Sequence, residues 1–300
     1  MTPGPELRPG ASLRSPRGRV YLLGNRLGDG SFGEVFDCLG PFDEACALKV
    51  FRPERGAAQV RDQWLKEAQR LYRLRHPHIV YVYDYFETEG LFFLVLERCD
   101  HTLEAMLDTP FTDRLVVEVT RQLLMAVQYL ADNEIVHNDL HAGNVLMRQG
   151  ERLTAKLSDL GIAQDLYGQH GVRPDLVQHR IMAPEILAGG YSTKQSDLYQ
   201  LGLLMFFMHT GEMAVDTTQG YDFIVEQIKN GAPRARAEAL GTPLGDIISV
   251  LLRRHEQYRY ASPEQVWEDL RRLDVWESYA PPVMPQASSD APPGDSDDGF

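Results

Sequence analysis

The pattern of apolar and polar positions changes near residue 100. Before that point, short apolar runs at 21–23, 45–50 and 92–96 are separated by polar residues and glycine, which predicts β-strands. One segment differs, because 63–74 repeats its apolar residues at helical spacing. The residues that form this apolar face are Trp64, Leu65, Ala68, Leu71 and Tyr72. We therefore expect one helix among the strands of the first hundred residues.

After residue 100 the apolar positions follow helical spacing. Thr112 or Asp113 can cap a long helix that runs to Leu130, because both side chains accept hydrogen bonds from the first turn. Residues 197–209 are apolar nearly all round, which predicts a buried helix. Two more amphipathic helices are expected within 243–272.

These patterns predict an α+β chain with two lobes. A small antiparallel sheet with one helix is expected over 19–98, and a larger, mainly helical lobe over 99–278. Residues 1–18 are rich in Pro, Gly and Arg and predict a flexible leader. Residues 279–300 turn to Pro, Ser and Asp and predict a disordered acidic tail.

Composition excludes some functions. The net charge of −13 over 300 residues argues against nucleic acid or an anionic membrane as the main partner. Three cysteines without metal-ligand spacing indicate reduced thiols and a cytoplasmic protein. No signal peptide is expected at the N-terminus, and the longest apolar run, 201–208, is too short to span a bilayer.

The strongest chemical candidate is the polar loop within 135–146, read IVHNDLHAGNVL. It places an acid, Asp139, five positions before an amide, Asn144. Such an acid can accept the proton of an attacking hydroxyl, and such an amide can hold magnesium on phosphates. Asp159 follows a strand in the turn LSDLG and is the main predicted magnesium ligand, because a hard cation prefers carboxylate oxygen.

A glycine-rich stretch, 27–36, contains Gly28, Gly30 and Gly33 in the pattern G-x-G-x-x-G. Glycines let a backbone approach phosphate oxygens. Residues 34–36 continue as strand formers, so we expect a β-hairpin over phosphates rather than the helix of a dinucleotide fold. A plain glycine turn is the alternative.

A single lysine, Lys49, lies in the apolar strand that follows, and Glu67 lies beside the apolar face of the predicted helix. After a glycine hairpin, such a lysine is expected to hold the α- and β-phosphates, with Glu67 fixing its ammonium group. The alternatives are an edge lysine and a solvated helix charge.

Together these motifs resemble a eukaryotic-type (Hanks) serine/threonine protein kinase over about residues 20–275. Seven motifs occur in the order of that family. They are the glycine stretch, Lys49, Glu67, H-x-D-L-x-x-x-N at 137–144, D-L-G at 159–161, A-P-E at 183–185 and D-x-Y-x-L-G at 197–202. Arg259 resembles the late arginine that pairs with the A-P-E glutamate, here Glu185.

The resemblance implies a bilobal protein-kinase-like fold and transfer of the γ-phosphoryl group of ATP to Ser/Thr hydroxyls of proteins, with Mg²⁺ or alternatively Mn²⁺. Asp139 would be the catalytic base, Lys49 and Glu67 an ion pair, and Asn144 and Asp159 the metal ligands. The implied nucleotide-binding residues are Leu27, Gly28, Gly30, Gly33, Val35, Ala47, Lys49, Glu97, Cys99 and Leu146, with the backbone of Glu97 and Cys99 on the adenine edge. Leu96 would be the gatekeeper, and a regulatory spine would contain Leu71, Val82, His137 and Leu160.

Two departures from the family pattern concern regulation. Asn138 stands where the family has the arginine that binds the phosphorylated activation loop. Residues 159–185 contain no Ser or Thr, and their only hydroxyl is that of Tyr167. We therefore expect a segment that is ordered constitutively or by a regulatory protein partner. That partner would act through the leader or the tail.

A further departure concerns the substrate. His141 and Gln178 replace a lysine and a threonine that bridge to the base in Ser/Thr kinases, so the contact is either rebuilt or lost. D-L-H-x-G-N also resembles the loop of aminoglycoside and choline kinases, which keeps a small-molecule kinase open. A third alternative is a pseudokinase, against which the joint retention of Lys49, Glu67, Asp139, Asn144 and Asp159 counts. Lysine occupies only five of 30 basic positions, which suggests a GC-rich, bacterial-like coding sequence.

Overall fold

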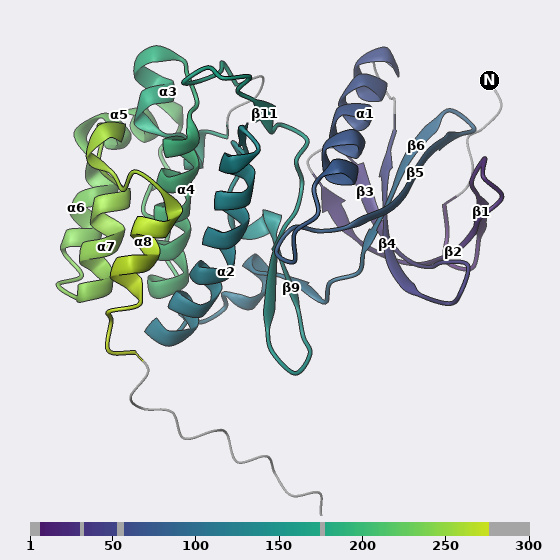
Figure 1. The fold of residues 1–300 in the computed structure, drawn as a ribbon, viewed down its shortest axis with the longest axis horizontal. Helices are drawn as coiled ribbons and strands as arrows, with labels where there is room; N and C mark the ends of the chain where they lie inside the picture. The colour runs from purple at the N-terminus through teal and green to yellow at the C-terminus, as the bar shows by residue number, and fades with distance from the viewer. Residues whose placement is uncertain (1–6, 31–32, 53–56, 175–177, 276–300) are drawn as a thin grey trace, which may run out of the picture.

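The structure is a computed structural model that describes residues 7–30, 33–52, 57–174 and 178–275. Figure 1 shows two lobes, a curled β-sheet with α1 on one side and a helical lobe beside it. The strands are β1 (Ser12–Arg14), β2 (Val20–Gly30), β3 (Gly33–Leu39), β4 (Ala45–Phe51), β5 (Val82–Thr88), β6 (Leu91–Glu97), β7 (His101–Thr102), β8 (Ile135–Val136), β9 (Val145–Arg148), β10 (Thr154–Leu157) and β11 (Gln164–Asp165). The helices are α1 (Ala57–Arg73), α2 (Asp113–Asp132), α3 (Pro184–Gly189), α4 (Lys194–Thr210), α5 (Tyr221–Asn230), α6 (Ala232–Glu238), α7 (Pro243–Leu251) and α8 (Pro263–Leu270), with 3₁₀ turns at Glu104–Met106, Ala142–Asn144, His179–Ile181 and Glu256–Tyr258.

The first lobe is built on a six-stranded antiparallel sheet in the order β1-β2-β3-β4-β6-β5. The ring of Tyr21 in β2 stacks on that of Phe86 in β5, with 5.8 Å between ring centres. Strands that are far apart in the sheet order therefore meet, so the sheet curls round its own apolar core. This arrangement confirms the predicted antiparallel lobe.

Helix α1 covers the other face of this sheet. Trp64 and Ala68 pack there against Phe92 and Leu94 of β6, and the Trp64 indole N–H donates to the carbonyl of Phe93 at 3.1 Å. The helix begins earlier than the apolar pattern predicts, because helix-favouring residues such as alanine, glutamine and arginine at 57–62 extend its N-terminal turns. Because Glu67 is part of α1, the packing of this helix determines the face of the sheet on which Glu67 lies.

The prediction of a flexible leader over 1–18 is wrong for residues 12–14, which form β1 at the edge of the sheet. Leu13 is buried in the core of the curled sheet. Arg17 reaches the buried carboxylate of Asp84 at 3.1 Å, and Arg19 reaches it at 3.5 Å. A single apolar residue between polar ones gives little sequence signal, so this strand depends on its neighbour β2.

In the helical lobe, α2 and α4 form the centre of the core. Thr112 caps α2 as predicted, with its hydroxyl oxygen accepting from the N–H of Leu115 at 3.4 Å. Helix α4 is buried on nearly every side, which confirms the prediction for 197–209. Helices α5 and α6 are additional to the predicted ones. The short α6 carries few apolar residues, so periodicity does not reveal it.

Two small sheets position the polar loops between the lobes. Strand β8 leads into 137–144 and pairs with β11, and β10 leads into Ser158 and Asp159 and pairs with β9. The two candidate loops lie side by side, since His137 Nε2 is 3.2 Å from the carbonyl of Ser158.

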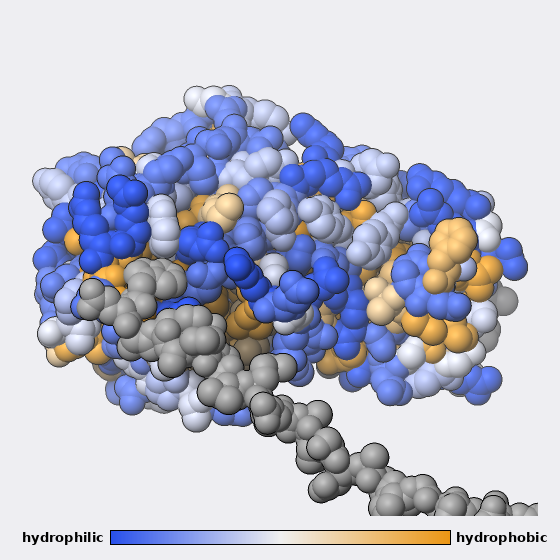
Figure 2. Space-filling model, turned by 60° about the horizontal axis from the view of Figure 1, so that its bottom comes forward, coloured by the Kyte–Doolittle hydropathy of each residue, from blue (hydrophilic) through white to orange (hydrophobic). Residues whose placement is uncertain are grey.

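The face shown in Figure 2 is mostly hydrophilic, with apolar side chains gathered at the end of the sheet lobe. Exposed apolar residues of that lobe include Leu22, Leu39 and Phe42. Within the described ranges, no helix has the length and apolar character needed to cross a membrane. The predicted tail at 279–300 lies outside the described residues and stays a prediction.

Candidate active site

The loop at 137–144 is held by one face of the buried helix α4. The carboxylate of Asp197 accepts from the backbone N–H groups of His137 at 2.8 Å and Asn138 at 3.0 Å. One turn further along α4, the Gln200 side chain accepts from the N–H of Leu140 and donates to the carbonyl of Asn138, both at 2.9 Å. The loop is therefore fixed at the two residues before Asp139 and at the residue after it.

This anchoring has an electrostatic cost. Burial raises the pKa of Asp197 to about 7, although the N–H groups of His137 and Asn138 act in the opposite direction. Asn138 itself has φ 69°, in the left-handed region that asparagine tolerates better than most residues.

Asp139 presents one carboxylate oxygen without a hydrogen-bond donor. Its Oδ2 accepts from the Asn144 side-chain N–H at 2.8 Å, and its backbone carbonyl accepts from the same amide at 2.9 Å. Its Oδ1 is buried and has no hydrogen-bond partner among the described residues. Leaving a buried acceptor unpaired is costly, so Oδ1 is the atom of this loop that is poised to receive a proton from a bound hydroxyl.

The charge state of Asp139 suits that role. Burial acts to raise the pKa of this carboxyl, but contacts with His141, His137 and Asn144 outweigh burial and lower it. The carboxyl is therefore ionised near neutral pH and can act as a base.

The replacements His141 and Gln178 meet beside this base. The His141 Nε2 lies 3.7 Å from Asp139 Oδ1, and the side-chain nitrogen of Gln178 lies 3.3 Å from the same imidazole nitrogen. The guanidinium of Arg180 approaches the other ring nitrogen of His141 at 3.4 Å. The two altered positions therefore touch each other, and His141 lies beside the base without a hydrogen bond to Oδ1.

Lys49 joins the two lobes through two carboxylates. Its Nζ lies 2.9 Å from Glu67 Oε1 on α1 and 3.2 Å from Asp159 Oδ2. Burial acts to lower the pKa of Lys49, but Asp159 and Glu67 outweigh it and raise the pKa, so the ammonium group stays charged. The predicted Lys49–Glu67 ion pair is thus formed in this structure.

Asn144 and Asp159, the predicted metal ligands, come from adjoining segments. Ser158 donates to the backbone carbonyl of Asn144 from its N–H at 2.9 Å and from its hydroxyl at 3.0 Å. Because the Asn144 amide nitrogen faces Asp139, its side-chain oxygen points elsewhere and accepts no hydrogen bond from the described residues. One carboxylate plus one amide oxygen suits Mg²⁺, which completes its shell with phosphate oxygens and water.

The predicted nucleotide residues come from strands of both lobes. Leu27 is 44% exposed, Val35 and Leu146 are half-buried, and Ala47 is buried. They belong to β2, β3, β9 and β4. Apolar side chains left partly open at a lobe junction suit the faces of a planar base.

The strand-to-linker passage at 97–99 offers the polar groups that an adenine edge needs. The N–H and carbonyl of Cys99 make no hydrogen bond within the described part of the chain. The N–H of Glu97 is used by the carbonyl of Tyr81 at 2.8 Å, so only its carbonyl could take part. The Glu97 side chain is buried and pairs with Lys156 at 2.9 Å, a contact that the sequence did not predict.

The glycines of the hairpin differ in what surrounds them. Gly28 and Gly30 lie in β2 and Gly33 begins β3, while the tip at 31–32 is outside the described residues. A side-chain carbon on Gly33 would collide with the carbonyl of Val50 in β4, whereas one on Gly28 would meet open space. Gly33 is therefore required by strand packing, and Gly28 leaves room above the junction.

Residues from both lobes share one core behind the loops. Leu71 and Val82 of the sheet lobe belong to the same apolar cluster as Leu160 of the helical lobe. His137 is buried beside them, and its Nε2 lies 3.2 Å from the carbonyl of Ser158. The structure thus brings the four residues of the predicted spine into the interior, and Leu96 lies half-buried in β6.

The A-P-E glutamate is bound as expected. Arg259 forms two hydrogen bonds with Glu185, at 2.9 and 2.7 Å. The hydroxyl of Ser196 adds a third contact to the same carboxylate at 2.6 Å. This pairing confirms the interpretation of Arg259 and fixes α3 against the helical lobe.

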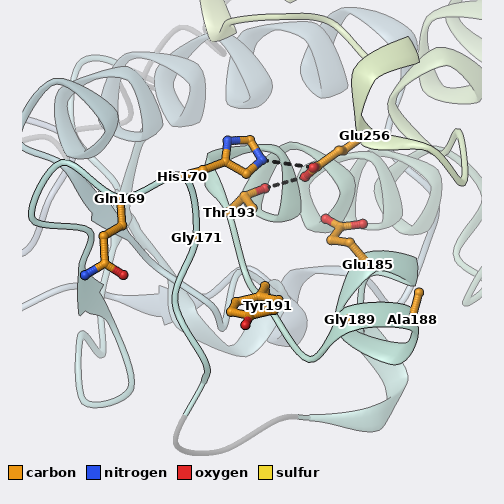
Figure 3. Close-up of a pocket in the computed structure, with 9 residues that line it drawn as sticks. All are labelled: Gln169, His170, Gly171, Glu185, Ala188, Gly189, Tyr191, Thr193 and Glu256. Carbon is orange, nitrogen blue, oxygen red and sulfur yellow. Dashed lines mark hydrogen bonds and ion pairs between the residues drawn. The ribbon is translucent and has the colours of Figure 1, made fainter.

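A hollow beside α3 is shown in Figure 3. Glu256 accepts there from the hydroxyl of Thr193 at 2.9 Å and contacts the imidazole of His170 at 3.0 Å. The lining residues are Gln169, His170, Gly171, Glu185, Ala188, Gly189, Tyr191, Thr193 and Glu256. None of them is a predicted nucleotide or catalytic residue, so this hollow is separate from the candidate site. The contacts of Glu256 hold the segment that contains His170 in place.

With this geometry established, comparison with known proteins identifies the class. A model of the protein kinase domain matches residues 21–269, and the chain therefore belongs to the protein kinase family.

Serine/threonine-protein kinases are among the proteins that the chain resembles. The probable serine/threonine-protein kinase zyg-1 of Caenorhabditis briggsae is 33% identical over 193 residues, which are 62% of this chain and 26% of that protein. Human serine/threonine-protein kinase STK11 is 29% identical over 80% of this chain and 58% of its own length. Serine/threonine-protein kinase PrkC of Bacillus subtilis is 26% identical over 85% of this chain and 40% of its own length. The chain thus spans less than two thirds of each of these relatives.

Several residues that shape the site were not predicted. Gln200 lies one turn after Asp197 on α4, and this spacing was the available signal for it. Ser192, whose hydroxyl donates to the side chain of Asn138, and Arg70, which contacts the loop after Asp159, carried no local signal. Their roles depend on contacts across 54 and 95 positions of the chain.

Proposed function

We propose that the chain is an ATP-dependent protein kinase that transfers the γ-phosphoryl group to Ser/Thr hydroxyls of protein substrates. The observation that carries this proposal is the buried Oδ1 of Asp139, which has no hydrogen-bond donor while Asn144 holds Oδ2. The Lys49–Glu67 ion pair and the serine/threonine kinase relatives support the same function.

In this proposal the residues have distinct roles. Asp139 accepts the proton of the attacking hydroxyl, and His141 with Gln178 positions the acceptor at Oδ1. Lys49 holds the α- and β-phosphates, since its charge is maintained by two carboxylates. The Gly28 region leaves space for the phosphates, and Cys99 offers a donor and an acceptor to the adenine edge.

Asn144 and Asp159 would hold the metal ion, Mg²⁺ or alternatively Mn²⁺. When bound, that ion neutralises charge on the phosphoryl oxygens. The donor set, an amide oxygen and a carboxylate oxygen, favours a hard cation of this kind.

We further propose a cytoplasmic phosphoprotein that is controlled by a regulatory protein partner, with neither nucleic acid nor membrane as a main ligand. Three free cysteines support the reducing compartment. The net charge of −13 disfavours polyanionic ligands.

The test is phosphate transfer from γ-labelled ATP with magnesium to the protein itself and to generic protein acceptors. We expect label on Ser or Thr, and a loss of roughly 10²–10⁴ in rate for Asp139→Asn with nucleotide affinity retained. Asp108→Asn, an exposed acid elsewhere on the helical lobe, is the matched control and should keep full activity.

Two outcomes would overturn the proposal. Label on small hydroxylated acceptors but on no protein would make the chain a small-molecule kinase. Nucleotide binding without label on either class of acceptor would make it a non-catalytic binding module.

A further inference from the structure

The first part of the segment 159–185, here called the activation segment, is paired directly with the strand before the loop at 137–144, here called the catalytic loop. Gln164 and Asp165 form β11 and pair with Val136 and Ile135 of β8, which leads into His137. The position of β11 is therefore coupled by strand pairing to the position of β8, which leads into the catalytic loop.

Asn138 strengthens this attachment without using a charge. Its side-chain N–H donates to the carbonyl of Ile162 at 3.2 Å and to the Gln164 side chain at 3.4 Å. Its side-chain oxygen accepts from the hydroxyl of Ser192, in the stretch before α4. One buried amide thus joins the catalytic loop to β11 and to the region that follows α3.

Arg70 connects this fixed strand to α1. It lies one helical turn after Glu67, and its Nη2 lies 3.2 Å from Asp165 Oδ2. Its Nη1 also approaches the carbonyl of Leu160 at 3.5 Å. The two side chains are only 16% and 26% exposed, so solvent screens their attraction less than it screens a surface pair.

Arg70 also acts on Glu67 through space. Burial raises the pKa of Glu67 to about 7, and the nearby charges of Lys49 and Arg70 oppose that rise. Arg70 therefore favours the ionised form that pairs with Lys49, in addition to holding the helix against β11.

We propose that the Arg70–Asp165 ion pair is a phosphate-independent clamp that keeps α1, and with it Glu67, in the position that pairs with Lys49. The fixed carboxylate of Asp165 here does what an added phosphate does in segments that are ordered by phosphorylation, where the phosphate pairs with arginine. Asn138 holds β11 in place so that Asp165 is a rigid partner. This inference rests on the proposed kinase activity and names how that activity is kept on without a phosphate in 159–185.

The composition of the segment fits the clamp. Residues 159–185 contain no Ser or Thr, and Tyr167 is 81% exposed. Its hydroxyl makes no hydrogen bond within the described residues. A phosphate on Tyr167 would thus have no role in the contacts that hold Asp165.

The experiment measures kcat/KM for a protein substrate with Arg70→Gln, Asp165→Asn and the charge swap Arg70→Asp/Asp165→Arg. We expect each single change to lower kcat/KM about tenfold, the scale of a typical coupling between sites. We expect the swap to recover most of that loss, which a merely structural role would not produce. Asp165→Glu keeps the charge and should remain active.

Arg61→Gln is the matched control, because Arg61 lies on the same helix and pairs with Glu87 at 3.0 Å, with side chains 59% and 42% exposed. It should change kcat/KM less than about twofold. Tyr167→Phe and phosphatase-treated wild type should retain full activity.

Single variants with the same kcat/KM as Arg61→Gln would overturn the clamp while leaving the proposed function intact. A swap variant that has the wild-type melting temperature but recovers no kcat/KM would do the same. A large loss in Tyr167→Phe would also overturn it. A wild type that labels no protein would overturn the proposed function and the clamp together. If the swap fails to fold, the contrast between Asp165→Glu and Asp165→Asn decides the question.

Discussion

At the scale of single residues, Asp197 shows how one buried carboxylate can organise a catalytic loop. It accepts hydrogen bonds from two backbone N–H groups of the loop and has no cationic partner among the residues that the structure describes. The loop is therefore held by an acceptor that is expensive to bury in charged form. That expense is what raises its pKa.

The raised pKa of Asp197 predicts a pH-dependent stability. Its pKa rises from 3.8 to about 7 on folding, so the folded state binds a proton more tightly than the unfolded state. The stability contributed by this group is fully present below about pH 4 and is lost as the pH rises through about 7. Melting temperatures at pH 5 and pH 8 should therefore differ less for Asp197→Asn than for the wild type. Equal differences in the two proteins would contradict this.

The buried ion pair of Glu185 and Arg259 predicts a large effect of a small change. The Arg259 side chain is completely buried and is held by both carboxylate oxygens. Glu185→Gln leaves a buried guanidinium without its counter-charge and should reduce the free energy of unfolding by about 3–5 kcal/mol. Urea unfolding measures this, with Glu238→Gln as the control, because the Arg234–Glu238 pair is largely exposed. A similar effect of both changes would refute the argument.

At the scale of elements, the glycine hairpin separates packing from ligand binding. Gly33→Ala should destabilise the protein by about 1–3 kcal/mol, because the new methyl group collides with the carbonyl of Val50. Gly28→Ala meets open space and should leave the melting temperature unchanged while raising KM for ATP. Thermal melting and KM for ATP, measured on both variants, distinguish the two effects. A normal melting temperature for Gly33→Ala would show that β3 and β4 are not packed this closely.

The elements also show what the sequence can predict. Local signals sufficed for α2, where Thr112 caps a periodic helix, and for Lys49 and Glu67, whose residue types and order carry the chemistry. Local signals did not suffice for β1, which depends on pairing with β2, or for α6, which has almost no apolar face. The Asn138 network and the Arg70–Asp165 pair join distant segments, so only the folded chain reveals them.

At the scale of the molecule, the two lobes are not independent units. Leu71 and Val82 of the sheet lobe are buried in the core of the helical lobe. The Lys156 ammonium group, on β10, reaches Glu97 at 2.9 Å and the carbonyl of Pro77 at 2.7 Å. The passage between the lobes is therefore fixed both by burial and by charge.

The edge strand β1 sets a limit on how far the protein can be shortened. The kinase-domain match begins at residue 21, so a version trimmed to that match lacks β1, Arg17 and Arg19. It would open the edge of β2 to pairing with other molecules and leave the buried carboxylate of Asp84 without its two cations. A version starting at residue 7 should elute and melt like the full chain, whereas one starting at residue 21 should melt lower and aggregate. Size-exclusion chromatography with thermal melting would decide, and identical behaviour of the two versions would mean that the unit of folding coincides with the unit of family resemblance.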